Sequence, residues 1–224
     1  MRIDFHGAVF DADGTLLDSM QVWRNLGELY LRKRNITPEK GLSARLWPMS
    51  YEQGCEYLRR HYGLKESVSE IQRGISGMIE GFYRNEAALK PGVSEFLEIL
   101  GRKNIHMVIA TSGDRELLNA ALARNSIAGF FDAVFTCTEL NTDKHHPEIF
   151  TACAESLGLL PENIAVFEDS LFAIETAKRA GFRTFGVYDA SSIHVKQSII
   201  DTADYYIDDW RNILNEDSTN DCRK

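Results

Sequence analysis

The sequence predicts an α/β fold in which a parallel sheet forms the core and a small all-helical domain is inserted into it. Three observations lead to this prediction. Short apolar runs that favour strands alternate with helical patterns from residue 88 onward, and one such run stands near the start of the chain. Residues 17–87 show only helical periodicity. Several apolar runs end in acidic or hydroxyl side chains, which is typical of the carboxyl edge of a parallel sheet.

The two predicted domains are interleaved along the chain. The first strand is expected at residues 7–10, which are apolar and β-prone. Apolar residues then recur at helical spacing without a convincing strand, so residues 17–87 are assigned to the helical domain. A Pro-Gly pair marks the exit from it. The core domain therefore comprises residues 1–16 and 88–224.

The rest of the core alternates between strand and helix. Ser94 is expected to cap the first of these helices. Strands are predicted at residues 105–110, 133–136, 164–167 and 184–187. Helices are predicted at residues 94–101, 114–124 and 147–157 and around residues 173–177. Strands and helices of this length form right-handed βαβ units, so we expect a Rossmann-like sheet with helices on both faces.

Composition excludes several classes of protein. A net charge of −8 argues against non-specific binding to nucleic acid, which depends mainly on Lys and Arg. The four cysteines form no CxxC pair, so neither a zinc cluster nor a disulfide framework is indicated. No apolar run approaches the roughly 20 residues of a membrane helix, and the N-terminus lacks a signal-peptide pattern. We therefore expect a cytoplasmic protein with no membrane or nucleic-acid partner; its oligomeric state is not readable from the sequence.

Acidic, hydroxyl and lysine side chains follow the predicted strands. These residues are Asp11, Asp13, Thr111, Ser112, Lys144, Glu168 and Asp169. In one parallel sheet they converge on a single edge, where two neighbouring carboxylates need a cation, most simply Mg²⁺. Phosphoryl transfer needs this set together, because a carboxylate attacks phosphorus, a second protonates the leaving oxygen, and cationic and hydroxyl groups hold the phosphoryl oxygens. The alternative is a purely structural set of turn and helix-cap residues.

The order and spacing of these residues resemble the four motifs of the haloacid dehalogenase (HAD) superfamily of phosphatases. The helical insertion directly after the first motif is similar to the cap of the β-phosphoglucomutase-like branch. The resemblance implies that Asp11 is the nucleophile, which becomes a phosphoaspartate, and that Asp13 is the general acid and then the general base. It also implies that Lys144 pairs with Asp11 and with the phosphoryl group.

The same resemblance implies binding roles for the other motif residues. Thr111 and Ser112 are expected to bind the transferring phosphoryl group, and Thr15 and Arg115 are further candidates for substrate contact. The Mg²⁺ ligands are expected to be Asp11, the Asp13 carbonyl, Asp169 and Glu168. The expected activity is Mg²⁺-dependent hydrolysis of a small phosphomonoester, a phosphorylated metabolite, under a helical cap that selects the leaving group.

Some positions depart from the family pattern. The family segment commonly reads Lys-Pro-x-Pro, whereas here it is Lys144-His145-His146-Pro147. Adjacent histidines without a third ligand at suitable spacing are interpreted as loop residues rather than zinc ligands. Trp23 stands where the sugar-phosphate mutases carry histidine, and Asp114-Arg115 where they carry Lys-Asn. Two alternatives therefore stay open, a β-phosphoglucomutase-type mutase and a catalytically idle HAD-like binding protein. Dehalogenase activity is disfavoured, because halide displacement needs neither an acid nor a metal.

Overall fold

The computed structural model describes residues 4–213. The chain divides into two compact units. The core unit consists of the described residues of Met1–Asp18 and Ala87–Lys224, and the helical unit is Ser19–Glu86.

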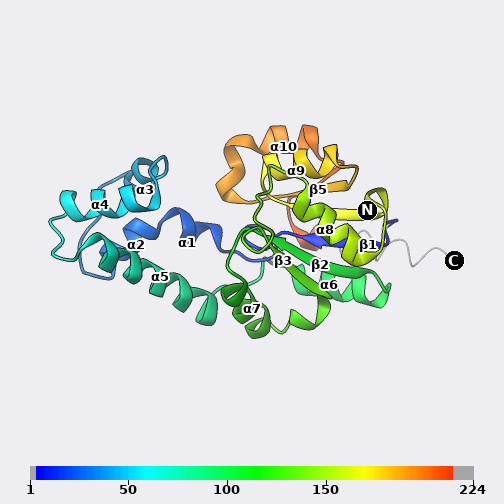
Figure 1. The fold of residues 1–224 in the computed structure, drawn as a ribbon, viewed down its shortest axis with the longest axis horizontal. Coiled ribbons are helices and arrows are strands. Elements are labelled where there is room, and N and C mark those ends of the chain that lie inside the picture. The colour runs from blue at the N-terminus through cyan, green and yellow to red at the C-terminus, as the bar shows by residue number, and fades with distance from the viewer. Residues whose placement is uncertain (1–3, 214–224) are drawn as a thin grey trace. The chain divides into compact units, whose positions relative to one another are not determined.

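The core unit contains a six-stranded sheet in which all strands are parallel and follow the order β3-β2-β1-β4-β5-β6 (Figure 1). The strands are β1 (Gly7–Phe10), β2 (His106–Thr111), β3 (Ala133–Thr136), β4 (Ile164–Glu168), β5 (Arg183–Val187) and β6 (Tyr205–Ile207). The helices are α6 (Val93–Arg102), α7 (Arg115–Arg124), α8 (Glu148–Leu157), α9 (Leu171–Arg179) and α10 (Lys196–Thr202). Short 3₁₀ helices are η1 (Ala128–Phe130), η2 (Pro161–Asn163) and η3 (Ala190–Val195).

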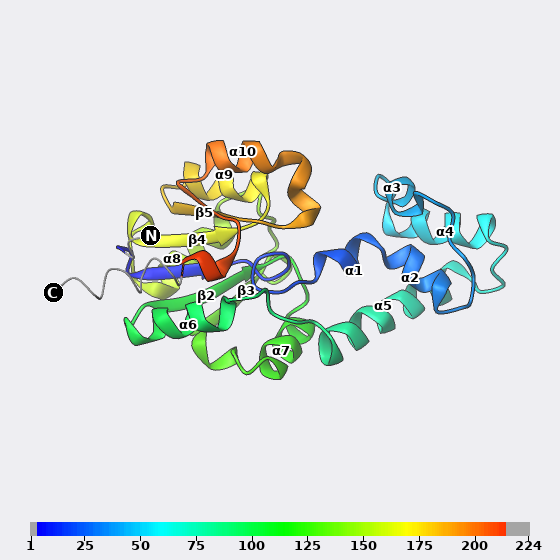
Figure 2. The same ribbon diagram turned by 180° about the vertical axis from the view of Figure 1, so that it is seen from behind.

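Helices cover both faces of the sheet (Figures 1 and 2). Both faces need cover because successive side chains of a strand point to opposite faces. On one face, Val9 and Val166 pack with residues of α8 and α9 such as Phe150 and Ala173. On the other face, Phe96 of α6 and Trp210 pack at ring-centroid distances of 6.5 and 6.3 Å from Phe10. The sheet is therefore buried on both sides, which confirms the expected Rossmann-like core.

A row of aromatic rings crosses four neighbouring strands on the second face. Phe10, Phe167, Phe185 and Tyr205 are paired in register on β1, β4, β5 and β6. Their rings stack with centroid distances of 4.6, 4.7 and 4.7 Å along the row. The first two rings immediately precede Asp11 and Glu168, so the row fixes the strand ends from which these carboxylates project.

Two sequence-based details of the core need correction. Strand β6 was not predicted, because three residues at the sheet edge carry too little periodicity to be recognised. The prediction that Ser94 caps a helix is wrong, since α6 begins at Val93 and Gly92 is its N-cap. Gly92 has φ 91°, and a Cβ there would lie 2.8 Å from the Arg211 backbone nitrogen, so glycine is needed at this turn.

The helical unit contains five α-helices and no strand within its described residues. They are α1 (Met20–Arg24), α2 (Leu26–Arg32), α3 (Leu42–Leu46), α4 (Tyr51–His61) and α5 (Val68–Asn85). The longest, α5, begins at a capping box in which the Ser67 hydroxyl accepts from the Glu70 amide and the Glu70 carboxylate accepts from the Ser67 amide. Its buried face presents Ile71, Ile75 and Ile79 at helical spacing.

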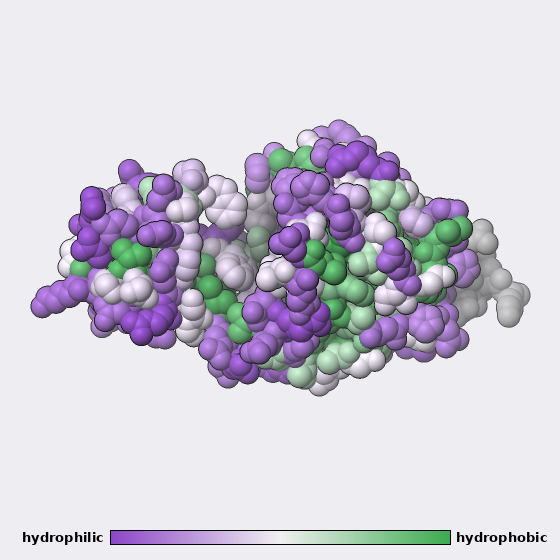
Figure 3. Space-filling model, in the orientation of Figure 1, coloured by the Kyte–Doolittle hydropathy of each residue, from purple (hydrophilic) through white to green (hydrophobic). Residues whose placement is uncertain are grey.

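The surface agrees with the acidic, hydrophilic composition. Figure 3 shows hydrophilic residues over most of the visible face, with apolar residues gathered in smaller patches on each unit. Trp47 and Leu160 are the most exposed of the large apolar side chains in the described part of the chain, at 67% and 62%. Among the described residues, no helix is both long enough and apolar enough to cross a lipid bilayer.

Candidate active site

The parallel pairing of β1 with β4 brings two carboxylates together. Phe10 pairs with Phe167 in register, so Asp11 and Glu168 occupy adjacent positions at the carboxyl ends of these strands. The Asp11 amide continues the ladder by donating to the Phe167 carbonyl oxygen at 3.0 Å. Both side chains are buried. Two carboxylates buried at adjacent strand ends repel each other, so a cation is needed to compensate their charge.

Lys144 supplies that positive charge. It lies in the connection between β3 and α8, and its ammonium donates to Asp11 Oδ1 and, at 2.9 Å, to Glu168 Oε1. Its side chain is 3% exposed. Burial by itself lowers the pKa of Lys144, but the carboxylates of Asp11 and Glu168 outweigh burial and raise the pKa above its ordinary value. The ammonium therefore stays charged at this site.

Glu168 and Asp169 complete an acidic cluster with Asp11. Burial, followed by the charge of Asp11, raises the pKa of Glu168 to about 7, although Lys144 opposes this shift. Burial and then the charges of Glu168 and Asp11 raise the pKa of Asp169 well above its usual range. More negative charge is therefore gathered here than the described side chains balance, which favours a bound cation.

The donor set of the cluster fits a hard divalent cation. One carboxylate oxygen from each of Asp11, Glu168 and Asp169 lies within 4.8 Å of the others. Asp11 Oδ2 is buried and has no hydrogen-bond partner among the residues that the structure describes. A buried carboxylate oxygen without a partner is costly, and an oxygen-coordinated ion such as Mg²⁺ would satisfy it.

The segment that follows β2 brings Thr111 close to Asp13. The Gly113 amide donates to Thr111 Oγ1 at 2.9 Å. A Cβ on Gly113 would lie 3.2 Å from both Asp13 Oδ2 and Thr111 Oγ1. The absence of a side chain at Gly113 therefore lets this segment approach the Asp13 carboxylate.

The other candidate substrate contacts, Thr15, Ser112 and Arg115, have different surroundings. Thr15 is buried, its hydroxyl has no partner among the described residues, and its carbonyl accepts from Trp210 Nε1 at 3.3 Å. The exposed Ser112 hydroxyl lies 3.5 Å from Cys137 Sγ. The Arg115 guanidinium is bound by the Glu139 carboxylate and donates to the Val134 carbonyl at 2.7 Å.

Arg115 is thus directed to the end of β3 in this structure, and a contact with substrate stays a prediction. Its hydrogen bond is the main reason why the pKa of Glu139 falls to about 2. Asp114, the residue before it, caps α7 by accepting from the amides of Glu116 and Leu117 at 2.9 and 3.0 Å. The acidic side chain at this position therefore has a helix-capping role.

The two adjacent histidines lie outside the carboxylate cluster that could hold a metal. The His145 ring stacks on Phe172, and His146 Nδ1 lies 3.0 Å from Asp143 Oδ1. Their rings thus have different partners, and neither belongs to a described group of three or more possible metal ligands.

Sequence reasoning missed an ion pair beside Asp169. Lys90 Nζ lies 2.9 Å from Asp189 Oδ2 and donates to the Tyr188 carbonyl at 2.5 Å. Ser192 Oγ, from η3, donates to Asp169 Oδ2 at 3.4 Å. Asp189 lies two residues beyond β5. A search for acidic residues just after predicted strands, which found the other site residues, could therefore have found Asp189 as well. Lys90 carried no such signal.

At its carboxyl edge the parallel sheet carries a buried lysine and three carboxylates that could hold a cation, which places the chain in the Rossmann-like α/β class. Residues 8–187 match the family model described as haloacid dehalogenase-like hydrolase. The chain therefore belongs to the haloacid dehalogenase-like hydrolase family, as the motifs of the sequence suggested. It is an enzyme of this family.

Curated relatives of the chain are named as phosphatases. A phosphorylated carbohydrates phosphatase of Thermotoga maritima is 28% identical over 184 residues, which cover 80% of this chain and 83% of the relative. A fructose-1-phosphate phosphatase of Escherichia coli is 26% identical over 185 residues, covering 79% and 93%. Among solved structures, a putative β-phosphoglucomutase from Thermotoga maritima superposes with a TM-score of 0.82 at 24% identity, covering 94% of this chain and 99% of that one. That structural likeness concerns the fold.

Proposed function

We propose that this enzyme hydrolyses a small phosphorylated carbohydrate by transferring its phosphoryl group first to Asp11 and then to water. The observation that carries the proposal is the buried contact of Lys144 with Asp11 and Glu168. Lys144 holds Oδ1 of Asp11, while Oδ2 has no hydrogen-bond partner among the described residues. An oriented carboxylate is the form in which aspartate acts as a nucleophile. The names of the relatives that act on phosphorylated carbohydrates and fructose 1-phosphate support the substrate class.

The proposed reaction has two balanced steps. In the first, a carboxylate oxygen of Asp11 forms a bond to phosphorus, the ester P–O bond breaks, and the Asp13 carboxyl gives its proton to the leaving sugar oxygen. In the second, water attacks the phosphorus of the phosphoaspartate and gives a proton to Asp13. The bond between phosphorus and the Asp11 oxygen then breaks, releasing inorganic phosphate.

Thr111 and Lys144 hold the transferring group in this proposal. The Thr111 oxygen already accepts from the Gly113 amide, so its own hydroxyl hydrogen is available to a phosphoryl oxygen. The charged Lys144 ammonium offsets the negative charge of both Asp11 and the phosphoryl group.

The carboxylates of Asp11, Glu168 and Asp169, with the Asp13 carbonyl, would hold Mg²⁺. When bound, this ion would neutralise negative charge on the nucleophile and on the phosphoryl oxygens. Addition of excess chelator to the purified enzyme should abolish phosphate release, and Mg²⁺ should restore it. Full activity in chelator, or zinc held by His145 and His146, would contradict the assignment.

Hydrolysis is favoured over sugar-phosphate isomerisation by the surroundings of Trp23. Its Nε1 donates to the Tyr83 hydroxyl at 2.9 Å within the helical unit, and its ring lines an apolar pocket beside Trp47. Indole has one donor and no base, so Trp23 cannot relay a proton as histidine does. A mutase must also favour a sugar hydroxyl over water as the acceptor of its phosphoryl group, and Trp23 offers no group for this.

The substrate class is tested by incubating the enzyme with a panel of phosphate esters and measuring inorganic phosphate. Sugar phosphates, including fructose 1-phosphate, should be hydrolysed faster than nucleotides or phosphoamino acids. Asp11→Asn should release no phosphate above background. Absence of turnover by the wild-type enzyme with every ester, aryl phosphates included, would instead favour the catalytically idle alternative.

The mutase alternative needs a separate assay. The enzyme is given β-glucose 1-phosphate with catalytic glucose 1,6-bisphosphate, and glucose 6-phosphate and free phosphate are followed together. Free phosphate should dominate. Rapid formation of glucose 6-phosphate with little free phosphate would overturn hydrolysis as the main reaction.

A further inference from the structure

The connection that carries Lys144 is fastened to helix α9 through the next residue, His145. The His145 ring stacks on the Phe172 ring with 4.2 Å between centroids and 22° between planes. The Thr176 hydroxyl lies 3.2 Å from the His145 carbonyl oxygen and 2.9 Å from the Phe172 carbonyl oxygen, so the two carbonyls share its one hydrogen. Thr176 is buried, and its oxygen also accepts from Arg179 Nη2 at 3.0 Å. The ring of His145 is therefore held by stacking on α9, and its carbonyl lies within hydrogen-bond distance of the same helix.

The residue before Lys144 is held as well. One carboxylate oxygen of Asp143, Oδ1, accepts from the His145 amide at 2.8 Å and lies 3.0 Å from His146 Nδ1. These contacts close a short turn around Lys144. The segment has no regular secondary structure, so its shape depends on such side-chain contacts.

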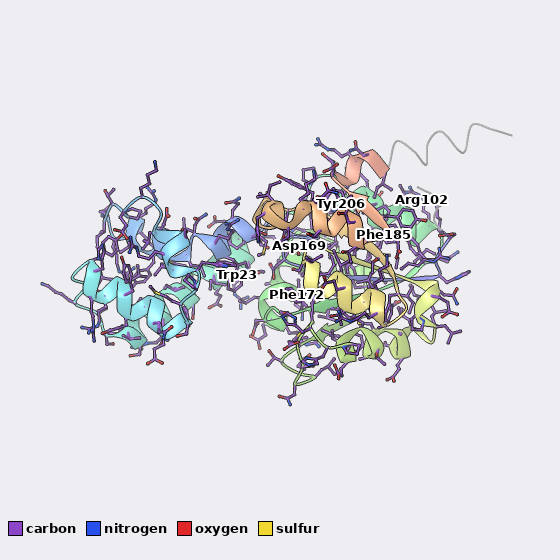
Figure 4. The ribbon with its side chains drawn as sticks, turned by 90° about the horizontal axis from the view of Figure 1, so that it is seen from above. Trp23, Arg102, Asp169, Phe172, Phe185 and Tyr206 are labelled. Carbon is purple, nitrogen blue, oxygen red and sulfur yellow. The ribbon has the colours of Figure 1, made fainter. Side chains whose placement is uncertain are left out.

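The position of α9 gives the His145 contact its significance. The helix begins at Leu171, directly after Asp169 and Ser170, and Phe172 is its second residue. Figure 4 shows Asp169 and Phe172 close together at this end of the core unit. Phe172 is 39% exposed, so its ring is only partly covered, and the His145 ring is its stacking partner. The stack thus links the neighbour of Lys144 to the helix that follows the metal-site carboxylates.

We propose that His145 and Phe172 are positioning residues whose stack holds the backbone of Lys144 so that its ammonium stays on Asp11 and Glu168. The proposal rests on the proposed function, in which Lys144 acts on the phosphoryl group. A lysine side chain has four rotatable bonds and reaches a fixed point only when its backbone is fixed. Small displacements of a catalytic group lower the rate strongly. Neither His145 nor Phe172 touches the reacting atoms in this account.

The stack is tested with truncated and conservative variants of both residues. Phe172→Ala and His145→Ala remove it, whereas Phe172→Tyr and His145→Phe preserve a ring at the same place. Because an aromatic pair is a moderate interaction, each truncation should lower kcat about three- to tenfold. The double variant should lose no more than the worse single variant, since both remove the same contact. The two conservative variants should keep the wild-type kcat.

His106→Ala is the matched control for the loss of an exposed histidine. His106 begins β2, at the opposite end of that strand from Thr111, and pairs with Asp132. Its kcat should equal that of the wild type. Thermal unfolding of every variant shows whether the fold is retained, and the conservative pair separates loss of the stack from a general loss of structure.

Two NMR signals test the inference without relying on turnover. The ring protons of His145 should shift upfield from the ring current of Phe172, and the shift should disappear in Phe172→Ala. The ¹⁵N signal of the Lys144 ammonium, assigned by its loss in Lys144→Met, should be sharp in the wild type and in Phe172→Tyr but broadened in Phe172→Ala.

Unchanged kcat and an unchanged ammonium signal in both truncations, or failure of Phe172→Tyr to restore them, would overturn the proposal. If the wild-type enzyme hydrolyses no ester, the proposed function fails, while the ammonium signal still decides whether the stack positions Lys144.

Discussion

Lys144 joins two carboxylates that come from different strands, and its burial makes their contact strong. Its ammonium is bound to Asp11 and Glu168, and all three side chains are less than 10% exposed. Removal of one partner from a buried ion pair leaves an uncompensated charge, which destabilises a protein far more than the loss of a surface pair. The stability of the core and the proposed catalysis therefore involve the same lysine.

Lys144→Met should lower the free energy of unfolding by about 3–5 kcal/mol, because Asp11 and Glu168 would then lie buried without a cation. The change is measured by urea unfolding in chelator, so that no added metal replaces the lost charge. Arg102→Met is the control. Arg102, which is labelled in Figure 4, makes an exposed pair with Glu98 at 3.7 Å, and the loss of this pair should have little effect. Equal stability of Lys144→Met and the wild type would show that the carboxylates of Asp11 and Glu168 do not depend on the Lys144 ammonium for charge compensation.

Asp11→Asn should keep the fold and lower phosphate release by about 10³-fold or more, because the side chain retains its size but loses the attacking charge. Circular dichroism checks the fold, and initial rates with a sugar phosphate check the activity. Beryllofluoride should modify Asp11 in the wild-type enzyme. Near-normal turnover of Asp11→Asn, or labelling at another residue, would remove Asp11 from the nucleophile's role.

At the scale of elements, the aromatic row shows how a strand end is held in place. Phe167 stacks between Phe10 and Phe185, and Glu168 follows it directly. The sequence predicted apolar strands at these positions. It did not predict the row, because a single strand does not reveal its register with its neighbours.

Phe167→Ala should therefore lower the free energy of unfolding by about 3–5 kcal/mol, through lost contacts and the cavity left in the sheet's core. The measurement is equilibrium urea unfolding followed by tryptophan fluorescence, since Trp210 lies 5.5 Å from the Phe167 ring centre. Leu160→Ala, at a 62% exposed position, should change stability by less than about 0.5 kcal/mol. Similar losses in the two variants would contradict the packing described here.

Prediction of the elements failed where few residues carried the signal. The strands next to β1 were recognised because their apolar runs are bounded by turn or polar residues. Strand β6 has three residues and depends on pairing with β5, which only the folded chain provides. The start of α6 was misplaced because both Gly92 and Ser94 are acceptable caps in sequence, and the turn at Gly92, which packs against residue 211, decides between them.

For the whole molecule, a bound cation should couple the active site to global stability. A ligand that binds the folded state alone stabilises it by about 2.7 kcal/mol at 100 times its dissociation constant. Mg²⁺ should therefore raise the unfolding temperature of the wild type in a concentration-dependent way. Asp169→Asn removes one of the three clustered carboxylates and should abolish most of this shift while leaving the fold intact.

The shift is measured by scanning calorimetry after exhaustive chelation, with Asp201→Asn as a control for an exposed carboxylate that lies outside the cluster. That control should respond to Mg²⁺ as the wild type does. An equal response of Asp169→Asn would place the stabilising ion elsewhere.

The sequence by itself determined the class of the fold, the helical insertion and the family, because strand and helix periodicity and the motifs at strand ends are local patterns. Asp11, Thr111, Lys144 and Asp169 were recognisable for the same reason. The family resemblance implied that Lys144 pairs with Asp11, but only the tertiary structure showed that Lys144 also bonds to Glu168 and that Arg115 turns to Glu139. It also decided that Lys90 pairs with Asp189 and that His145 stacks on Phe172. The physical reason is that such contacts depend on strand register and loop path, which are set by packing across distant segments and leave no periodic trace in the chain.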